Sequence, residues 1–231
     1  RLRSGTTLAE RPRHGDPESS ESMNVIAFSL WGSSEKYLNG AEENFKLQPL
    51  IYPGWKLRLY CDCTVPEERL NHFKQLYDVD IHVMTNDKGS HYGTSWRFRV
   101  HDDQEVDRFL IRDCDSRLNW RERAAVDEWI SSDKTYHFMR DHPHHNKPIQ
   151  AGMWGGRVNA LKIIPMIDRW DQWGFYGCDE VFLAHVYPFI KNDALVHDPF
   201  YEKKQFPQHL PILNGGTHVG QSFINNSPVF V

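Results

Sequence analysis

Short apolar runs rich in β-branched residues alternate with helical stretches along most of the chain, and this alternation limits the fold more than any other feature. The apolar runs predict strands at residues 24–30, 56–61, 80–84, 108–112, 135–139 and 194–197. Helices are expected at about 34–50, with a break near Asn39 and Gly40, from about 64, and at about 119–131, 160–172 and 178–190. Alternating strands and helices form a mostly parallel sheet with helices on both faces, so the expected fold class is α/β.

The first 22 residues differ from the rest, with four Arg, four acidic residues and two Pro but almost nothing apolar. Such a segment buries too little apolar surface to order itself, so residues 1–22 are expected to be a disordered tail or linker. Residues 23–231 are expected to form a single domain whose last part, 199–231, is mostly loop with a short strand at 222–224. No stretch resembles a secretory signal or approaches the ~20 apolar residues of a membrane helix, so the expected location is cytoplasmic.

The charge balance is mildly acidic, with 27 basic and 31 acidic residues and a net charge of −4. Nucleic-acid binding requires clustered cations, so no nucleic-acid partner is expected. Aromatic residues make up 13% of the chain. Most of these rings are expected in the core, and the others offer flat faces in a cleft that suit sugars or nucleobases.

Asp113 and Asp115 follow directly after the predicted strand at 108–112. Residues two apart in an extended chain point to the same side, so both carboxylates can aim at one point. Two such anions repel unless a proton or a cation lies between them, and Mg²⁺ or Mn²⁺ accepts carboxylate and phosphate oxygens together. Because ligands bind beyond the carboxyl ends of parallel strands, the pair predicts a metal-bridged diphosphate, with a solvated turn as the alternative.

The acidic pair lies in a longer run from Arg112 to Trp129, RDCDSRLNWRERAAVDEW, which resembles a group of glycosyltransferases from bacteria and large DNA viruses. Similar blocks follow in the same order: HFMRDHP at 137–143, GMWG at 152–155, GCDEVFL at 177–183 and VHD at 196–198. The pair itself is similar to the D-x-D signature of glycosyltransferases with the GT-A fold. The resemblance implies a GT-A-like domain that moves a sugar from a nucleotide diphosphate donor, first of all a UDP-sugar, to a hydroxyl of a glycan, protein or small-molecule acceptor.

The resemblance also implies roles for particular residues. Asp113 and Asp115 would hold Mn²⁺ or Mg²⁺, with His197 as the third ligand and His218 as its alternative. Donor contacts are expected from Ser29, Leu30 and Trp31, from Trp96, Arg97 and Arg99, and from Gly152 and Trp154 in a small-residue turn. Arg117 is expected to contact phosphate, or else to pair with Asp115 or Glu122.

An inverting transferase needs a carboxylate that takes the proton of the acceptor hydroxyl. Asp179, at the start of a predicted helix, is the first candidate for this base and Asp141 is the second. The sequence departs from the resemblance at Glu180, where the group has Gln, so acceptor contacts can differ there. The His-rich stretch at 139–145 is compatible with a loop facing acceptor or diphosphate, a solvated loop, or a zinc site.

Two other classes of function fit the same residues. A nucleotidyltransferase or a metal-dependent phosphohydrolase also uses paired Asp at a strand end, and would release phosphate or diphosphate without an acceptor. A non-catalytic module that binds sugars or nucleotides would use the aromatic residues and the metal pair but lack a base.

Overall fold

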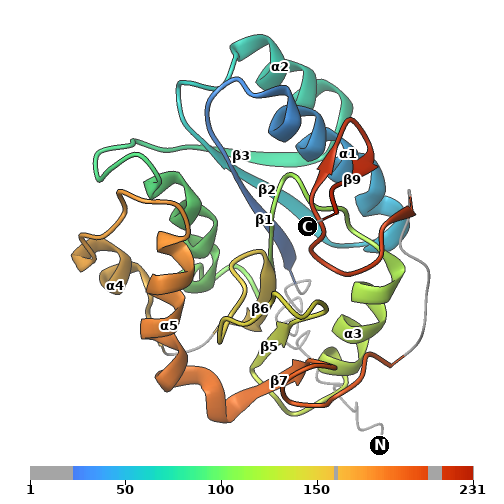
Figure 1. Ribbon diagram of the computed structural model, residues 1–231. Helices are drawn as coiled ribbons and strands as arrows, with labels where there is room; N and C mark the ends of the chain where they lie inside the picture. Colours follow the sequence, from blue (N-terminus) through green and yellow to red (C-terminus); the bar gives the residue numbers. More distant parts are fainter. Residues whose placement is uncertain (1–22, 159–160, 208–214, 231) are drawn as a thin grey trace, which may run out of the picture.

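The computed structural model describes residues 23–158, 161–207 and 215–230. Within them, one sheet has the strand order β3-β2-β1-β4-β6-β5-β7 (Figure 1). The strands are β1 (Asn24–Leu30), β2 (Lys56–Cys61), β3 (Val79–Val83), β4 (Arg108–Arg112), β5 (Tyr136–Met139), β6 (Met153–Arg157) and β7 (Ala194–His197). The six strands expected from the sequence are confirmed, each within one residue at either end.

Strand β6 is not predicted by the sequence pattern, which favours a turn at 152–156. It runs antiparallel to its neighbours β4 and β5, whereas the other strand pairs of the sheet are parallel. Its glycines permit close packing: a Cβ on Gly155 would lie 2.5 Å from Phe109 O, and one on Gly156 would lie 2.9 Å from the Phe109 ring. Glycine weakens a strand signal in the sequence even where the tertiary structure requires it.

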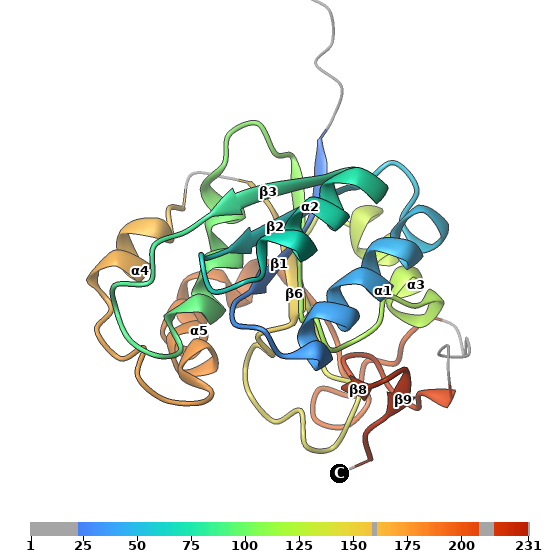
Figure 2. The same cartoon turned by 90° about the horizontal axis from the view of Figure 1, so that it is seen from above.

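Helices cover both faces of the sheet, as expected (Figure 2). The cluster on one face includes residues of α1 (Glu35–Ile51), α2 (Glu67–Leu76) and α3 (Trp120–Ile130). The other includes residues of the 3-10 helix η1 (Tyr92–Asp102), α4 (Ile164–Arg169) and α5 (Cys178–Ile190), and α5 leads through η2 (Lys191–Asp193) into β7. Along β1, alternate residues enter the two clusters, so the sheet is buried on both sides.

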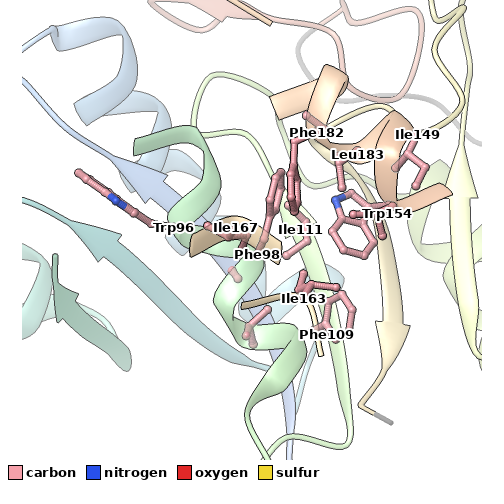
Figure 3. Packing of buried hydrophobic residues seen from close by; sticks show 14 of the residues in the cluster. Trp96, Phe98, Phe109, Ile111, Ile149, Trp154, Ile163, Ile167, Phe182 and Leu183 are labelled. Carbon is pink, nitrogen blue, oxygen red and sulfur yellow. The ribbon is translucent and has the colours of Figure 1, made fainter. Parts of the chain in front are cut away.

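The second cluster is mostly aromatic (Figure 3). Phe98 from η1 lies among side chains of β4, β6 and α5, and its ring stacks on Phe182 with centroids 6.3 Å apart. Trp96 from η1 packs edge to face against Trp31 and Tyr92. Trp154 meets Phe109 edge to face at 5.3 Å. These rings fix the position of η1 against the sheet, and η1 carries residues to the site described below.

The helices of the structure differ from the expectation in three places. Helix α1 continues through Asn39 and Gly40, because Gly40 faces the backbone of another segment at close range rather than ending the helix. Helix η1 was not predicted. The helix expected at 160–172 is confined to α4, while residues 159–160 lie outside the described part.

The last described segment forms a hairpin of β8 (Phe223–Ile224) and β9 (Ser227–Pro228) beside α1 (Figure 1). The tail expected at 1–22 lies outside the described residues. Across the described part, no helix combines the length and the apolar character needed to cross a bilayer.

Candidate active site

A cavity of about 580 Å³ opens at the carboxyl ends of β1 and β4, between α1 and α5. Its volume lies in the range of small-molecule sites, and its position is the one where α/β sheets bind ligands. The lining residues come from the segment after β1, from η1, from the end of β4, from the loop before β6, from the start of α5 and from the C-terminal segment.

Asp113 and Asp115 both line this cavity, in the loop of residues 113–118 that is here called the acid loop. The side chain of Asp113 is 39% exposed and that of Asp115 is 15% exposed. Asp113 pairs with Arg97, and Asp115 pairs with Lys36 at 2.7 Å. Burial lowers the pKa of Lys36, but the hydrogen bond and charge of Asp115 outweigh this and raise it above its usual value. Both acids therefore face one hollow, each paired with one basic residue.

Asn44 on α1 is fully buried and binds the acid loop through both ends of its amide. Its Nδ2 group donates to Ser116 O at 2.9 Å and to Cys114 O at 3.3 Å, and its Oδ1 accepts from Leu118 N at 2.9 Å. Gly40, one turn earlier, permits the close approach, since a Cβ there would lie 2.2 Å from Cys114 O. Helix α1 thus fixes the backbone that carries the two acids.

Arg97 reaches the cavity from η1 and lies between two acids. Its buried guanidinium donates to Arg112 O at 2.7 Å, pairs with Asp113, and approaches Asp179 Oδ2 at 3.4 Å. Burial lowers the pKa of Arg97, but the charges of Asp113 and Asp179 outweigh this and raise it above its usual value. The guanidinium therefore stays a cation. Its backbone N–H donates to Ser29 Oγ at 3.0 Å, which joins η1 to the end of β1.

Gly152, just before β6, leaves room for the Asp113 carboxylate. A Cβ at this position would lie 1.8 Å from Asp113 Oδ2, so a larger residue would displace the acid. The sheet register pairs Arg112 with Met153 and so puts Gly152 beside Asp113. This close approach explains a glycine here without any contact to a ligand.

Asp179 and Glu180 begin α5 and line the cavity. Burial raises the pKa of Asp179, and the charge of Arg97 opposes that rise. Burial also raises the pKa of Glu180 to about 7, with a further contribution from the charge of Asp179. The amide orientation of Gln150 that gives both its oxygen and its nitrogen hydrogen-bonding partners has the nitrogen donating to Glu180 Oε1 at 2.8 Å. A carboxyl whose pKa lies near neutrality is suited to accept a proton from a hydroxyl.

Ser29, Leu30 and Trp31 line the cavity at the end of β1. The Trp31 indole packs on Gly93 of η1, where a Cβ would lie 2.6 Å from the ring. Of the residues expected from the sequence, the cavity therefore collects Ser29, Leu30, Trp31, Arg97, Asp113, Asp115, Gly152 and Asp179.

Trp96 and Trp154 lie elsewhere, although both were expected to contact the donor. Both are fully buried and neither is among the cavity-lining residues, because their rings fill the aromatic cluster between the sheet and its covering helices (Figure 3).

Arg99 and Arg117 are also absent from the cavity wall. Arg99 donates to Asp168 at 3.0 Å and to the Tyr92 hydroxyl at 2.9 Å. Arg117 lines a separate hollow of about 310 Å³ beside α1. Its guanidinium lies 5.0 Å from the Phe223 ring and donates to Asn226 Oδ1 at 3.2 Å, and no ion pair with Asp115 or Glu122 forms within the described residues.

His197, the expected third metal ligand, is fully buried at the end of β7 and does not line the cavity. Its Nδ1 is hydrogen-bonded to His137 at 2.9 Å, and its Nε2 lies 3.3 Å from Glu128. His218, the alternative ligand, lies against His142 with ring centroids 4.5 Å apart. The structure therefore does not bring His197 to the two acids.

Asp141, the second candidate base, is buried outside the cavity wall. Arg121 donates to its two oxygens at 2.7 Å each, and Val219 N donates at 2.9 Å. These bonds stabilise the charged carboxylate and join the loop after β5 to the C-terminal segment. Asp141 is therefore placed to hold Gly220 and Ser222, which line the cavity.

The acid loop offers the kind of oxygen ligands that a hard divalent cation prefers. In the described ranges no three His, Cys, Asp or Glu side chains are grouped to hold an ion, so the protein offers two carboxylates rather than a closed site. Mg²⁺ and Mn²⁺ suit such a partial set, because water and substrate phosphate oxygens complete the coordination. The space kept clear by Gly152 next to Asp113, and the exposure of that carboxylate, agree with this donor set.

Sequence reasoning missed Asn44, Lys36, Glu180 as an ionisable group, and Tyr176, which also lines the cavity. Asn44 did leave a signal. It lies on the apolar stripe of α1 with Leu38, Ala41 and Phe45, and a polar side chain on such a stripe indicates a buried hydrogen-bonding role. The positions of Lys36 and Tyr176 depend on long-range packing, which leaves no local pattern.

No family model matches the sequence, and no curated protein does either. Among solved structures, the mannosyltransferase PcManGT from Pyrobaculum calidifontis, in complex with GDP-Man and Mn²⁺, is similar with a TM-score of 0.51 and 12% identity. That likeness covers 83% of this chain and 59% of the mannosyltransferase.

Two further structures have TM-scores of 0.49. A glycosyltransferase involved in the glycosylation of the major capsid of PBCV-1 is 17% identical over 77% of this chain and 82% of its own. S. aureus TarS 1-349 is 12% identical over 76% of this chain and 58% of its own. The sheet, its covering helices and the likeness to the mannosyltransferase confirm the expected α/β, GT-A-like fold.

Proposed function

We propose that this protein is a metal-dependent glycosyltransferase that moves a sugar from a nucleotide diphosphate donor to an acceptor hydroxyl. The observation that carries the proposal is the charge of the cavity wall. Asp113, Asp115, Asp179 and Glu180 line it, with Arg97 as the one guanidinium among the described lining residues. An anionic diphosphate would be repelled by this wall unless a cation bound with it.

Asp113 and Asp115 would hold that cation, Mn²⁺ or Mg²⁺. When bound, it would neutralise the charge that develops on the leaving diphosphate. Arg97 would keep Asp113 in place and add a fixed positive charge. Ser29, Leu30 and Trp31 lie at the end of β1, where the nucleoside would bind. The likeness in fold to a mannosyltransferase solved with GDP-Man and Mn²⁺ supports this arrangement.

In an inverting reaction, the Asp179–Glu180 pair would supply the general base. The two carboxyls are adjacent and interact, so they would titrate as a pair rather than separately. Asp179 is paired with Arg97 and lies in the first turn of α5, whereas Glu180 has the pKa nearer neutrality. Asp141 is assigned a structural role instead, because Arg121 and Val219 occupy its oxygens.

A donor panel tests the proposal. The folded protein with Mn²⁺ is given UDP-sugars first and GDP-sugars second, and release of nucleoside diphosphate is measured with and without glycoside acceptors. Release that depends on the metal and rises with an acceptor is expected. Failure to bind or turn over any nucleotide sugar would contradict the proposal, and steady release of inorganic phosphate without an acceptor would favour a phosphohydrolase.

A further inference from the structure

Tyr176 is the most exposed of the large apolar and aromatic side chains in the described residues, at 91%. It nevertheless lines the cavity. Within the described chain its side chain makes no hydrogen bond and no ring contact, so its neighbours do not explain its position. An isolated exposed ring on a convex surface needs no explanation, but one at the rim of a ligand cavity offers a flat apolar face to whatever enters.

The position of Tyr176 relates it to the candidate base rather than to the nucleoside end of the cavity. It lies in the loop of residues 174–177, here called the tyrosine loop, which precedes α5 directly. Gly177 has a φ of +81° and turns the chain into the helix, so Tyr176 is followed at once by Asp179 and Glu180 in the first turn. The residues after β1, where the nucleoside would bind, belong to another segment.

The cavity that Tyr176 lines also reaches the acid loop. Tyr37 extends from the first turn of α1 and lines the same cavity. Tyr37, Tyr176 and Asp115 therefore line one cavity, and a ring stacked on Tyr176 would share that cavity with the acid loop.

We propose that Tyr176 is the platform on which a neutral sugar ring of the acceptor stacks, beside Asp179 and Glu180. The proposal rests on the proposed function and names its acceptor class. A pyranose presents an apolar C–H face that packs on an aromatic ring, and hydroxyl groups at its edge that need hydrogen-bonding partners. Glu180 and Gln150, which line the same cavity, can supply such partners.

Charge complementarity selects a neutral saccharide over an acceptor that carries phosphate or carboxylate groups. Two carboxylates, Asp179 and Glu180, follow the tyrosine loop, and Asp113 faces the same hollow. An acidic acceptor would be repelled by Asp179 and Glu180 beside the tyrosine loop, and Arg97 is already paired with Asp113 and Asp179.

The test compares Tyr176→Ala, Tyr176→Phe and Tyr176→Trp with the wild-type protein. The acceptor KM is measured on methyl glycosides with saturating donor and metal. Tyr176→Ala is expected to raise this KM roughly tenfold, while Tyr176→Phe and Tyr176→Trp stay within about threefold because the ring face remains. Phe189→Ala is the matched control, because Phe189 is an exposed aromatic residue at the far end of α5 and 65% exposed.

A binding experiment keeps the two proposals separable. Saturation-transfer NMR with methyl glycosides, in the presence of Mg²⁺ and UDP and in their absence, is expected to show transfer to ring C–H protons for the wild type and not for Tyr176→Ala. The affinity for UDP with Mg²⁺ is expected to be equal in both proteins, and circular dichroism checks that both are folded.

Any of three results would overturn the role of Tyr176 in acceptor binding while leaving the proposed sugar transfer intact. The first is an unchanged acceptor KM in Tyr176→Ala, and the second is equal saccharide binding by both proteins. The third is weaker UDP binding by the variant, which would assign the ring to the donor. Loss of nucleotide binding and turnover in the wild type would instead contradict the glycosyltransferase itself. Saccharide binding would then still decide the role of Tyr176.

Discussion

The acid loop and the tyrosine loop line the same cavity but are held differently. The acid loop accepts hydrogen bonds from Asn44 of α1 and, at Asp115 O, from Phe223 N of the C-terminal segment at 2.8 Å. The tyrosine loop leaves Tyr176 almost entirely exposed. The acid loop is thus held by buried polar bonds from distant parts of the chain. The tyrosine loop contains Gly174 and Gly177, and the side chain of Tyr176 forms no hydrogen bond and no ring contact within the described residues.

This difference matches the two tasks that we assign to the cavity. A diphosphate and its metal require fixed carboxylates, because electrostatic stabilisation depends on groups that are already in place before reaction. An acceptor sugar can instead be bound by a flat ring that tolerates some variation in orientation. The first predictions test whether the acid loop is the fixed part of the site, and the last concerns the start of α5, which follows the tyrosine loop.

The largest effect is expected from Asp113→Asn and Asp115→Asn. Loss of either carboxylate should lower transfer by ~10³-fold, about 4 kcal/mol, because the metal pair is broken. Nucleoside diphosphate release at saturating donor measures this. Asp127→Asn on α3, an exposed residue paired with Arg123, is the control and should keep wild-type turnover. An Asp113→Asn protein with more than a tenth of wild-type turnover would argue against the acid loop as the metal site.

A large loss of stability is expected from Asp141→Ala. The substitution leaves the side chain of Arg121 without its two 2.7 Å bonds to a buried carboxylate and frees Val219 N, and should lower the free energy of unfolding by about 3 kcal/mol. Urea unfolding measures this. The pH dependence of the remaining transfer should keep its shape. A stable variant that has lost turnover would restore Asp141 as the candidate base.

A smaller loss is expected from Asn44→Ala. It removes the amide that binds three backbone groups of the acid loop, and should lower the free energy of unfolding by about 2 kcal/mol. Because the two acids would then be less fixed, the Mn²⁺ concentration for half-maximal transfer should rise several-fold. Asn39→Ala on the same helix, which loses only a bond from Arg69, is the control. Equal behaviour of the two variants would show that Asn44 does not position the loop.

The smallest effect is expected from Glu180→Gln and concerns pH. The pKa of Glu180 is about 7 in the folded protein, so between about pH 4.5 and 7 the native state retains a proton that the unfolded state releases. This group therefore makes the protein less stable as pH rises through that window. Glu180→Gln removes this contribution. The free energy of unfolding of the variant, relative to that of the wild type, should therefore be higher at pH 8 than at pH 5.

Urea midpoints at the two pH values measure the change, with Glu105→Gln at an exposed position as the control. Wild-type transfer should also rise with pH as the Asp179–Glu180 pair loses its proton, and this rise should flatten in Glu180→Gln if Glu180 is the base. A pH difference of the same size in Glu105→Gln would show that Glu180 is not specially perturbed.

Most of the fold follows from local patterns. The strands at 24–30, 108–112 and 194–197 combine apolar runs with β-branched residues, and tertiary contacts reinforce that preference. The missed elements are those where packing overrides propensity. Gly155 and Gly156 lie in a strand because large residues of β4 and β5 approach them, and Gly40 stays in a helix because Cys114 O lies against it.

The site residues that follow the carboxyl end of a strand were predictable from the sequence. Those whose position depends on which side chains are buried were not. Asp113 and Asp115 directly follow β4, and ligands of open α/β sheets bind beyond the carboxyl ends of the strands, so their place in the cavity was predictable. In contrast, the sequence cannot distinguish an aromatic ring in the core from one in a cleft, so Trp96 and Trp154 were expected at the donor and Tyr176 was not singled out. His197 ends a strand, β7, but His137 and Glu128 hold it in the interior.

The central claim is that Asp113 and Asp115 bind a divalent cation together with a nucleoside diphosphate. Calorimetric titration of UDP, and then GDP, into the folded protein tests it most directly, with Mn²⁺ or EDTA present and with Asp113→Asn as the comparison. We expect binding in Mn²⁺ that weakens at least tenfold in EDTA and by a similar factor in Asp113→Asn. Equal affinity with and without the metal, or in the variant, would contradict the account.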